Sequence, residues 1–142
     1  MAFLTYRRRL PHWRQDGATY FVTWRIAEGA PGLDDDERDL VFEALGHFDG
    51  ARYDLHARVV MNDHVHVLVT PRAPWHLSQL LHTWKSFTAH AIQKRGRRHG
   101  RFWQDEYFDR IVRNEVELLQ KLHYIEENPA RRFEIEGRYP WL

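Results

Sequence analysis

The sequence predicts an α+β domain in which helices pack against a mainly antiparallel sheet. Segments with the patterns of strands and helices follow one another in the order β-α-β-β-α-β-α. A chain of 142 residues is a usual size for one domain and is long enough to bury a core. No internal repeat, low-complexity segment or long linker divides it. We therefore expect residues 1–142 to form a single domain.

The first half of the chain is expected to contain three strands and one helix. Thr19–Ile26 is rich in β-branched and aromatic residues, as strands are. Residues 34–48 predict a helix, because acidic N-cap residues precede an apolar stripe formed by Leu40, Val41, Ala44, Leu45 and Phe48. Tyr53–Met61 is expected to be a strand with one face made of Tyr53, Leu55, Ala57 and Val59. A turn then leads into a strand that begins at His64 and that Pro71 and Pro74 end.

The second half is expected to contain two helices and one strand. Residues 77–94 predict a helix with an apolar stripe of Leu77, Leu80, Leu81, Trp84, Phe87 and Ala91, and with Thr88 at its edge. Tyr107–Val112 is the best place for a short strand. Asn114 and Glu117 form an Asn variant of the capping box, so the last helix should begin at Glu115. Asn128–Pro129 is expected to end it, because a residue before proline disfavours the α region.

Composition excludes several classes of function. The chain has no cysteine, so disulfides, thiolate catalysis and cysteine-ligated zinc are all excluded. No signal peptide is recognisable, and no run approaches the roughly 18 apolar residues of a membrane span. We therefore expect a soluble intracellular protein.

Charged residues are unevenly distributed, although the net charge is only +1. Basic residues gather at Arg7–Arg9 and in the segment 94–101, and acidic residues gather near the start of the first expected helix. Two interpretations stay open. The basic groups are either solvated surface patches or a rim that binds phosphate.

His64 and His66 are the most informative residues. Side chains alternate along a strand, so both imidazoles should project from one face while Val65, Val67 and Val69 fill a core on the other. Their Cα atoms should lie roughly 6–7 Å apart, close enough to share a metal ion. A lone histidine is usually structural, but a pair on one face favours a metal site. Strand-borne His-x-His pairs also serve zinc hydrolases, lyases and cupin-type oxygenases, so the reaction stays open.

Tyr124 and Asn128 lie one turn apart on the last expected helix. At about 100° per residue, Tyr124 is nearly opposite the middle of the apolar face formed by Leu118, Leu119, Leu122 and Ile125. A tyrosine that faces away from its helix's core has little packing reason to be there, but an ordinary surface tyrosine is the alternative. Tyr20 and Tyr107 are competing candidates, for which core packing is the simpler account. A metal pair together with such a tyrosine suggests phosphoryl transfer.

Four segments resemble a known family, in the same order along the chain. Met61–Leu68 is similar to the His-hydrophobe-His strand of single-tyrosine HUH transposases. The others are Trp84–Thr88, then Phe102–Gln104 followed by Tyr107–Arg113, and finally Tyr124–Pro129. The nearest branch is the REP-associated tyrosine transposases, also called transposase IS200-like proteins. The resemblance runs from about residue 6 to residue 141, and four motifs in order are specific.

The resemblance implies a ferredoxin-like α/β sandwich with a central antiparallel sheet and helices packed on it. It implies that His64, His66 and Asn128 bind a divalent metal, Mg²⁺ or Mn²⁺, and that Tyr124 is the nucleophile. The implied activity is that of a metal-dependent endonuclease and strand transferase, a transposase that acts on single-stranded DNA bearing REP-like hairpins through a 5′-phosphotyrosine. A monomer or homodimer in the bacterial cytoplasm, associated with the nucleoid, is expected.

Basic groups and aromatics are expected to contact the DNA. The candidates are Arg7, Arg8, Arg9, Lys85, Lys94, Arg95, Arg97, Arg98 and Trp103. Two other classes of function remain open: a hairpin-binding protein without chemistry, and an unrelated His-x-His metal hydrolase in which Tyr124 has no role.

Overall fold

The helices and strands follow the order predicted from the sequence in the computed structural model, which describes residues 17–96, 98–133 and 139–142. In chain order they are β1 (Thr19–Arg25), α2 (Asp35–Gly46), β2 (Tyr53–Val60), β3 (His64–Pro71), α3 (Leu77–Gln93), β4 (Phe108–Val112) and α4 (Glu115–Phe133). Within this described part, no helix combines the length and apolar character needed to cross a bilayer.

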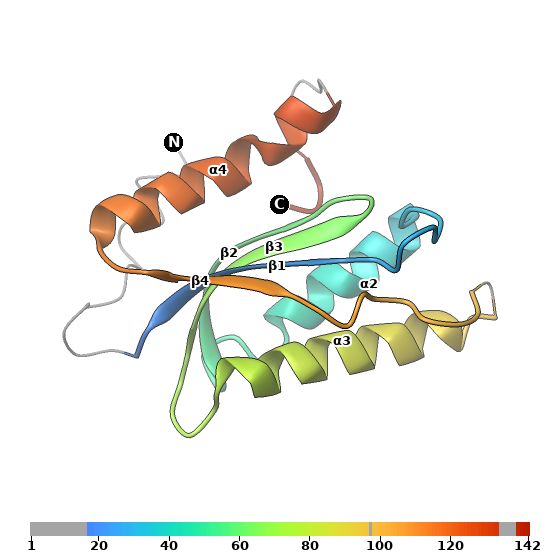
Figure 1. The fold of residues 1–142 in the computed structure, drawn as a ribbon, viewed down its shortest axis with the longest axis horizontal. Helices are drawn as coiled ribbons and strands as arrows, with labels where there is room; N and C mark the ends of the chain where they lie inside the picture. Colours follow the sequence, from blue (N-terminus) through green and yellow to red (C-terminus); the bar gives the residue numbers. More distant parts are fainter. Residues whose placement is uncertain (1–16, 97, 134–138) are drawn as a thin grey trace.

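The four strands form one antiparallel sheet in the order β2-β3-β1-β4. This order, with a helix after β1 and another after β3, is the ferredoxin-like arrangement that the family resemblance implied. Helices α2 and α3 lie on one face of the sheet and α4 crosses the other face (Figure 1). The predicted fold class is therefore confirmed.

Strand β3 separates two apolar cores. Val65, Val67 and Val69 are fully buried in the core beneath α2 and α3, as the alternation predicted. The core beneath α4 contains Phe21, Ala57, Val59, Met61, Leu68, Val112, Leu118, Leu122 and Ile125. The last three come from α4 and are fully buried. Burial of each contributes about 1.5–3 kcal/mol, so α4 is firmly held against the histidine-bearing face of the sheet.

Strand β2 does not keep one side-chain alternation along its length, so the expected single face is wrong. The pairing with β3 shifts between Leu55 and Ala57 at a β-bulge. The extra residue reverses which side chains point to which face. Tyr53 and Leu55 consequently pack beneath α2 and α3, whereas Ala57 and Val59 pack beneath α4.

The apolar stripe of α3 also differs from the expectation. Phe87 is 58% exposed, and the buried stripe instead continues through Thr88 and Ile92. Thr88 is accommodated because its hydroxyl donates to the Trp84 carbonyl and accepts from the Trp103 indole N–H. A hydrogen-bonded hydroxyl can replace an apolar group in a core at little cost. Hydrophobicity alone therefore predicts a buried Phe87, whereas the buried position is that of Thr88.

The start of α4 agrees with the sequence prediction, whereas its end does not. Asn114 does cap the helix, because its Oδ1 accepts from the Glu117 N–H at 2.9 Å. The Glu117 carboxylate accepts from the N–H of Arg113. The expected stop at Asn128–Pro129 is wrong, since the helix continues to Phe133 with Pro129 inside it. Proline costs a helix interior about 3 kcal/mol, and the tertiary contacts of the buried α4 face outweigh that local preference.

Candidate active site

His64 and His66 lie side by side on the face of β3 that α4 covers. Their ring centroids are 4.7 Å apart and the rings meet edge to face. Both side chains are buried, with 4% and 5% of their surface exposed. The predicted pairing of the two imidazoles on one face is therefore what the structure shows.

Each imidazole is oriented by a neighbouring side chain. The Asp63 carboxylate lies 2.6 Å from Nδ1 of His64, and the Thr23 hydroxyl lies 2.7 Å from Nδ1 of His66. A hydrogen bond from Nδ1–H leaves the lone pair on Nε2, the usual arrangement of metal-ligating histidines. Within the part of the chain that the structure describes, Nε2 of His66 is buried without a hydrogen-bond partner. Sequence reasoning did not assign roles to Asp63 and Thr23, although Asp63 directly precedes His64.

Tyr124 reaches this pair from α4. Its ring lies 5.4 Å from the His66 ring and 5.9 Å from the Phe21 ring, edge to face in both contacts. The side chain is 37% exposed, so the tyrosine is neither part of the core nor directed fully into solvent. It stands on the flank of α4, and its length carries the ring back to the sheet. The predicted position nearly opposite the apolar face is therefore wrong, because the ring contacts Phe21 of the core beneath α4 as well as His66.

Asn128 is the remaining predicted ligand, one turn after Tyr124. Its side-chain oxygen is buried and has no hydrogen-bond partner among the described residues. Leaving such an oxygen unpaired costs about 1–3 kcal/mol, unless another group binds there. The oxygen of Asn128 on α4 and Nε2 of His66 on β3 are thus two buried atoms whose lone pairs have no hydrogen-bond partner among the described residues.

These residue types fit a divalent metal ion. In the described segments, no three His, Asp or Glu side chains come together as a ligand group. Among the described residues, a third protein ligand would therefore be of another type, and the amide oxygen of Asn128 is of a suitable type. Two imidazole nitrogens and one oxygen suit Mn²⁺ and similar ions better than Mg²⁺, which prefers oxygen.

The site is electropositive and His66 is neutral in it. Burial, with additional contributions from the nearby His64, Arg25 and Lys121, lowers the pKa of His66 to about 3. Lys121 holds its ammonium 4.8 Å from the centre of the Phe21 ring. A neutral imidazole at physiological pH is the form that binds a metal. Arg25 was missed by sequence reasoning, because its position opposite His64 comes from the register of β1 against β3.

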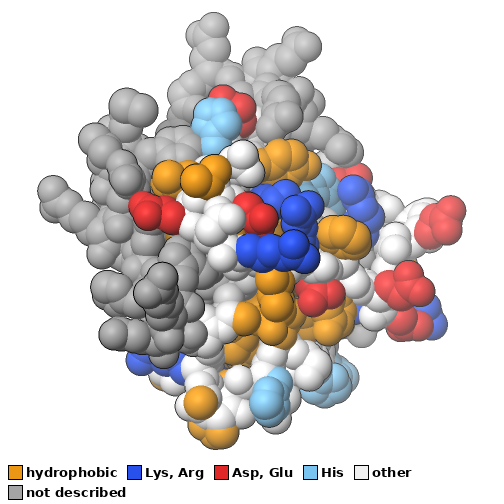
Figure 2. Space-filling view, turned by 60° about the vertical axis from the view of Figure 1, so that its left-hand side comes forward, with side chains coloured by type: hydrophobic (Ala, Val, Ile, Leu, Met, Phe, Trp, Pro, Cys, Tyr) orange, Lys and Arg blue, Asp and Glu red, His pale blue; other side chains and the backbone are white. Residues whose placement is uncertain are grey.

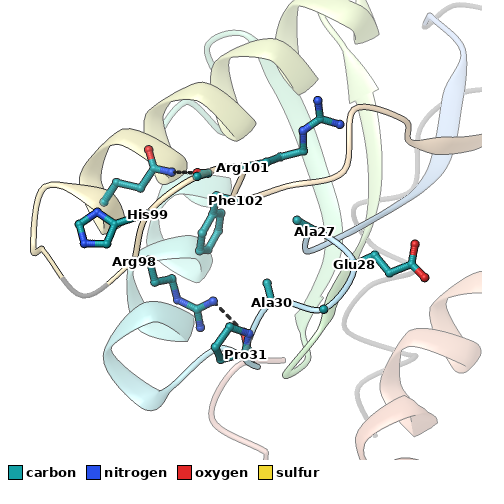
Figure 3. A pocket seen from close by; sticks show the side chains of 11 residues that line it. Ala27, Glu28, Ala30, Pro31, Arg98, His99, Arg101 and Phe102 are labelled. Carbon is teal, nitrogen blue, oxygen red and sulfur yellow. Dashed lines mark hydrogen bonds between the residues drawn. The ribbon is translucent and has the colours of Figure 1, made fainter.

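Two of the basic residues predicted to contact DNA, Lys85 and Arg98, bind other groups of the protein. Lys85 donates to the carbonyls of Gln104 and Asp105, and burial lowers the pKa of its ammonium. Arg98 forms a buried ion pair with Glu37 and donates to backbone carbonyls beside the pocket in Figure 3. The residues that line this pocket do not include His64, His66, Tyr124 or Asn128.

The other predicted DNA contacts fall into three groups. Arg7, Arg8, Arg9 and Arg97 lie outside the described residues. Lys94 and Arg95 are exposed at the end of α3, where Arg95 lies beside acidic residues of α2. Trp103 is not an exposed stacking surface, because it is buried and its indole N–H donates to Thr88.

The family model described as "Transposase IS200 like" matches residues 33–128, more than half of the chain. The chain belongs to the IS200-like transposase family. The match includes both histidines, Tyr124 and Asn128.

Two solved structures share the fold of this IS200-like chain. One is a REP-associated tyrosine transposase bound to a REP hairpin, with a TM-score of 0.74 and 20% identity, over 93% of this chain and 81% of that one. The other is a putative transposase from Deinococcus radiodurans, with a TM-score of 0.54 and 21% identity, over 77% of this chain and 88% of that one. No match was found among curated proteins.

Proposed function

We propose that this chain is a metal-dependent endonuclease and strand transferase that acts on hairpin-bearing single-stranded DNA through a covalent 5′-phosphotyrosine at Tyr124. The observation that carries the proposal is the contact of the Tyr124 ring with the His66 ring, 5.4 Å between centroids, because His66 is paired with His64. Membership of the IS200-like transposase family supports it. The hairpin is proposed as the substrate because a structure of the same fold holds a REP hairpin.

The proposed reaction exchanges one phosphodiester for another. The phenol oxygen of Tyr124 attacks the scissile phosphorus and forms an O–P bond, and the bond from phosphorus to the 3′ oxygen breaks. The phenol proton is lost and the departing oxygen gains a proton, which leaves a 3′-OH and a 5′-phosphotyrosine. A 3′-OH later attacks the phosphotyrosine and releases the phenol. The bond energy is retained, so no nucleotide triphosphate is consumed.

The residues of the chain supply position and charge for this step. Leu118, Leu122 and Ile125 fix α4 against the sheet, and α4 fixes Tyr124 beside His66. Arg25 and Lys121 place positive charge where a phosphate would lie, which favours the build-up of negative charge in the transition state. His64, His66 and Asn128 would hold the metal, which when bound polarises a phosphate oxygen.

The contact between Tyr124 and His66 within one chain supports a site that a single chain assembles. Tyr124 touches His66 of the same molecule, so the nucleophile and the metal-binding pair do not need to come from different subunits. We therefore propose that cleavage takes place in cis. Mixing a Tyr124→Phe chain with a His66→Ala chain should then restore no adduct, whereas restored adduct formation would show that the tyrosine acts in trans.

The central experiment detects the covalent adduct. The protein is incubated with Mn²⁺ or Mg²⁺ and labelled single-stranded DNA bearing a hairpin, and adducts are resolved on a denaturing gel. Wild type should form an adduct and Tyr124→Phe should not. Tyr107→Phe is a matched control, because Tyr107 is 36% exposed, close to the 37% of Tyr124, and lies just before β4 and not on α4.

The outcome also separates the alternative functions. An adduct that survives Tyr124→Phe would remove the proposed nucleophile. Binding of hairpin DNA without any adduct would identify a hairpin-binding protein without chemistry. Neither binding nor adduct, together with metal-dependent hydrolysis of other esters, would identify a His-x-His hydrolase.

A further inference from the structure

Strand β4 presents an exposed aromatic side chain on the same face of the sheet as the histidines. Phe108 is 67% exposed although it is large and apolar. It pairs directly with Thr23 of β1, and Thr23 pairs with His66 of β3. Directly paired residues point to the same face of a sheet. Phe108 therefore continues the row from His66 through Thr23 to the edge of the sheet.

The row places Phe108 close to the proposed site of chemistry. Neighbouring strands lie about 4.8 Å apart, so the backbones of His66 and Phe108 are separated by about 10 Å. Tyr124 stands over the His66 end of this row. The same register places Arg110 of β4 opposite Phe21, whose ring touches both Tyr124 and His66.

Three cationic side chains surround this row. Arg25 pairs with His64, Arg110 pairs with Phe21, and Lys121 lies over the Phe21 ring. Arg25 and Arg110 take part in none of the salt bridges found among the described residues. Those that involve arginine are formed by Arg38, Arg72, Arg98 and Arg101. Figure 2 shows basic side chains gathered on one face of the molecule, with hydrophobic and acidic side chains at their border.

We propose, on the basis of the function proposed above, that this face is a subsite for single-stranded DNA in which Phe108 stacks on an unpaired base and Arg110 and Arg25 bind the adjoining phosphates. The charge favours this ligand, because Arg110, Arg25 and Lys121 bring positive charge to the sheet face on which Phe108 is exposed, and this combination matches a polyanion that carries exposed bases. Single-stranded nucleic acid is generally bound in this way, by a positively charged groove with aromatic side chains on which bases stack. The subsite would fix the strand beside Tyr124 without reading a sequence.

Stacking is tested with a fluorescein-labelled oligothymidylate, whose binding to the full chain is followed by fluorescence anisotropy at low salt. Loss of one stacking contact should weaken binding roughly 5- to 150-fold in Phe108→Ala. Phe108→Trp should bind as wild type does, and Phe108→Leu should bind as poorly as Phe108→Ala. Equal affinity of wild type with Phe108→Ala or with Phe108→Leu would overturn the stacking role.

Ile111→Ala is the matched control. Ile111 is on the same strand and 46% exposed, but it pairs with Tyr20 and so points to the other face of the sheet. Its replacement should leave binding unchanged, and a loss equal to that of Phe108→Ala would overturn the proposal. Thermal melting should show that both variants fold, since both side chains are largely exposed.

Phosphate binding is tested through the salt dependence. For single strands, log K falls with log [salt] by about 0.7 per phosphate contact. Arg110→Gln should reduce that slope by about this amount, and an unchanged slope would overturn the role of Arg110. If both tests fail while the adduct at Tyr124 still forms, the subsite is wrong and the proposed function stands. A different result would refute the proposed function itself, namely an adduct that still forms in Tyr124→Phe.

Discussion

Acidification should destabilise the protein through His66. Burial lowers the pKa of this imidazole to about 3 in the folded chain, whereas the unfolded chain has an ordinary value of about 6.5. As the pH falls below 6.5, the unfolded state takes up a proton that the folded state does not accept until about pH 3. Proton uptake by the unfolded state favours unfolding, so the penalty is absent above about pH 7.5 and grows as the pH falls.

The magnitude follows from the two pKa values. At pH 5 the unfolded imidazole is about 1.5 pH units below its pKa, and each pH unit is worth about 1.4 kcal/mol. His66 should therefore reduce the free energy of unfolding by about 2 kcal/mol between pH 7.5 and pH 5. The side chain is 5% exposed, so solvent screens this effect little.

Urea unfolding, followed by tryptophan fluorescence in the presence of a chelator, measures the effect. Wild type and His66→Gln are each unfolded at pH 7.5 and at pH 5, and the loss of stability should be about 2 kcal/mol smaller in the variant. Comparing pH differences removes the direct cost of the substitution. His82→Gln is the control, because His82 is exposed on α3 and its replacement should leave the acid-induced loss unchanged. Equal losses in wild type and His66→Gln would refute the reasoning.

Three further predictions concern α4, the loop after α3 and the metal. Leu122→Ala removes a fully buried side chain of α4 and should lower the free energy of unfolding by about 2–5 kcal/mol in urea titrations, whereas Val116→Ala, at a 64% exposed position, should have little effect. Arg98→Met leaves the buried Glu37 carboxylate without its ion-pair partner and should cost about 3–5 kcal/mol by the same measurement, and adding Glu37→Gln should recover part of this loss. Asp63→Asn weakens the support of the His64 imidazole and should reduce Mn²⁺ affinity about 10- to 100-fold in calorimetric titrations; unchanged affinity would contradict metal binding at His64.

The order of helices and strands was predictable because each element has a local signal. Alternation put Val65, Val67 and Val69 in one core and the two histidines on the other face. The cap at Asn114 gave the start of α4. These predictions hold because strand alternation and helix capping act over a few residues.

The predictions that fail concern positions where tertiary contacts outweigh local preferences. The β-bulge after Leu55 depends on the pairing of β2 with β3 and reverses the expected face. Pro129 lies within α4 although its local preference is to end a helix. Trp103 and Arg98 were predicted to contact DNA from the sequence. In the structure, Trp103 donates to the buried Thr88 hydroxyl and Arg98 pairs with the buried Glu37 carboxylate.

The sequence by itself determined the chemical character of the site: paired imidazoles on one strand face, and a tyrosine followed one turn later by an amide. Only the tertiary structure decided that these two groups meet, because the contact between Tyr124 and His66 depends on how α4 crosses the sheet. The row from His66 to Phe108 likewise depends on the pairing of three strands that are distant in the sequence. Spacing along one element follows from its own geometry, whereas the approach of separate elements depends on the packing of the whole core.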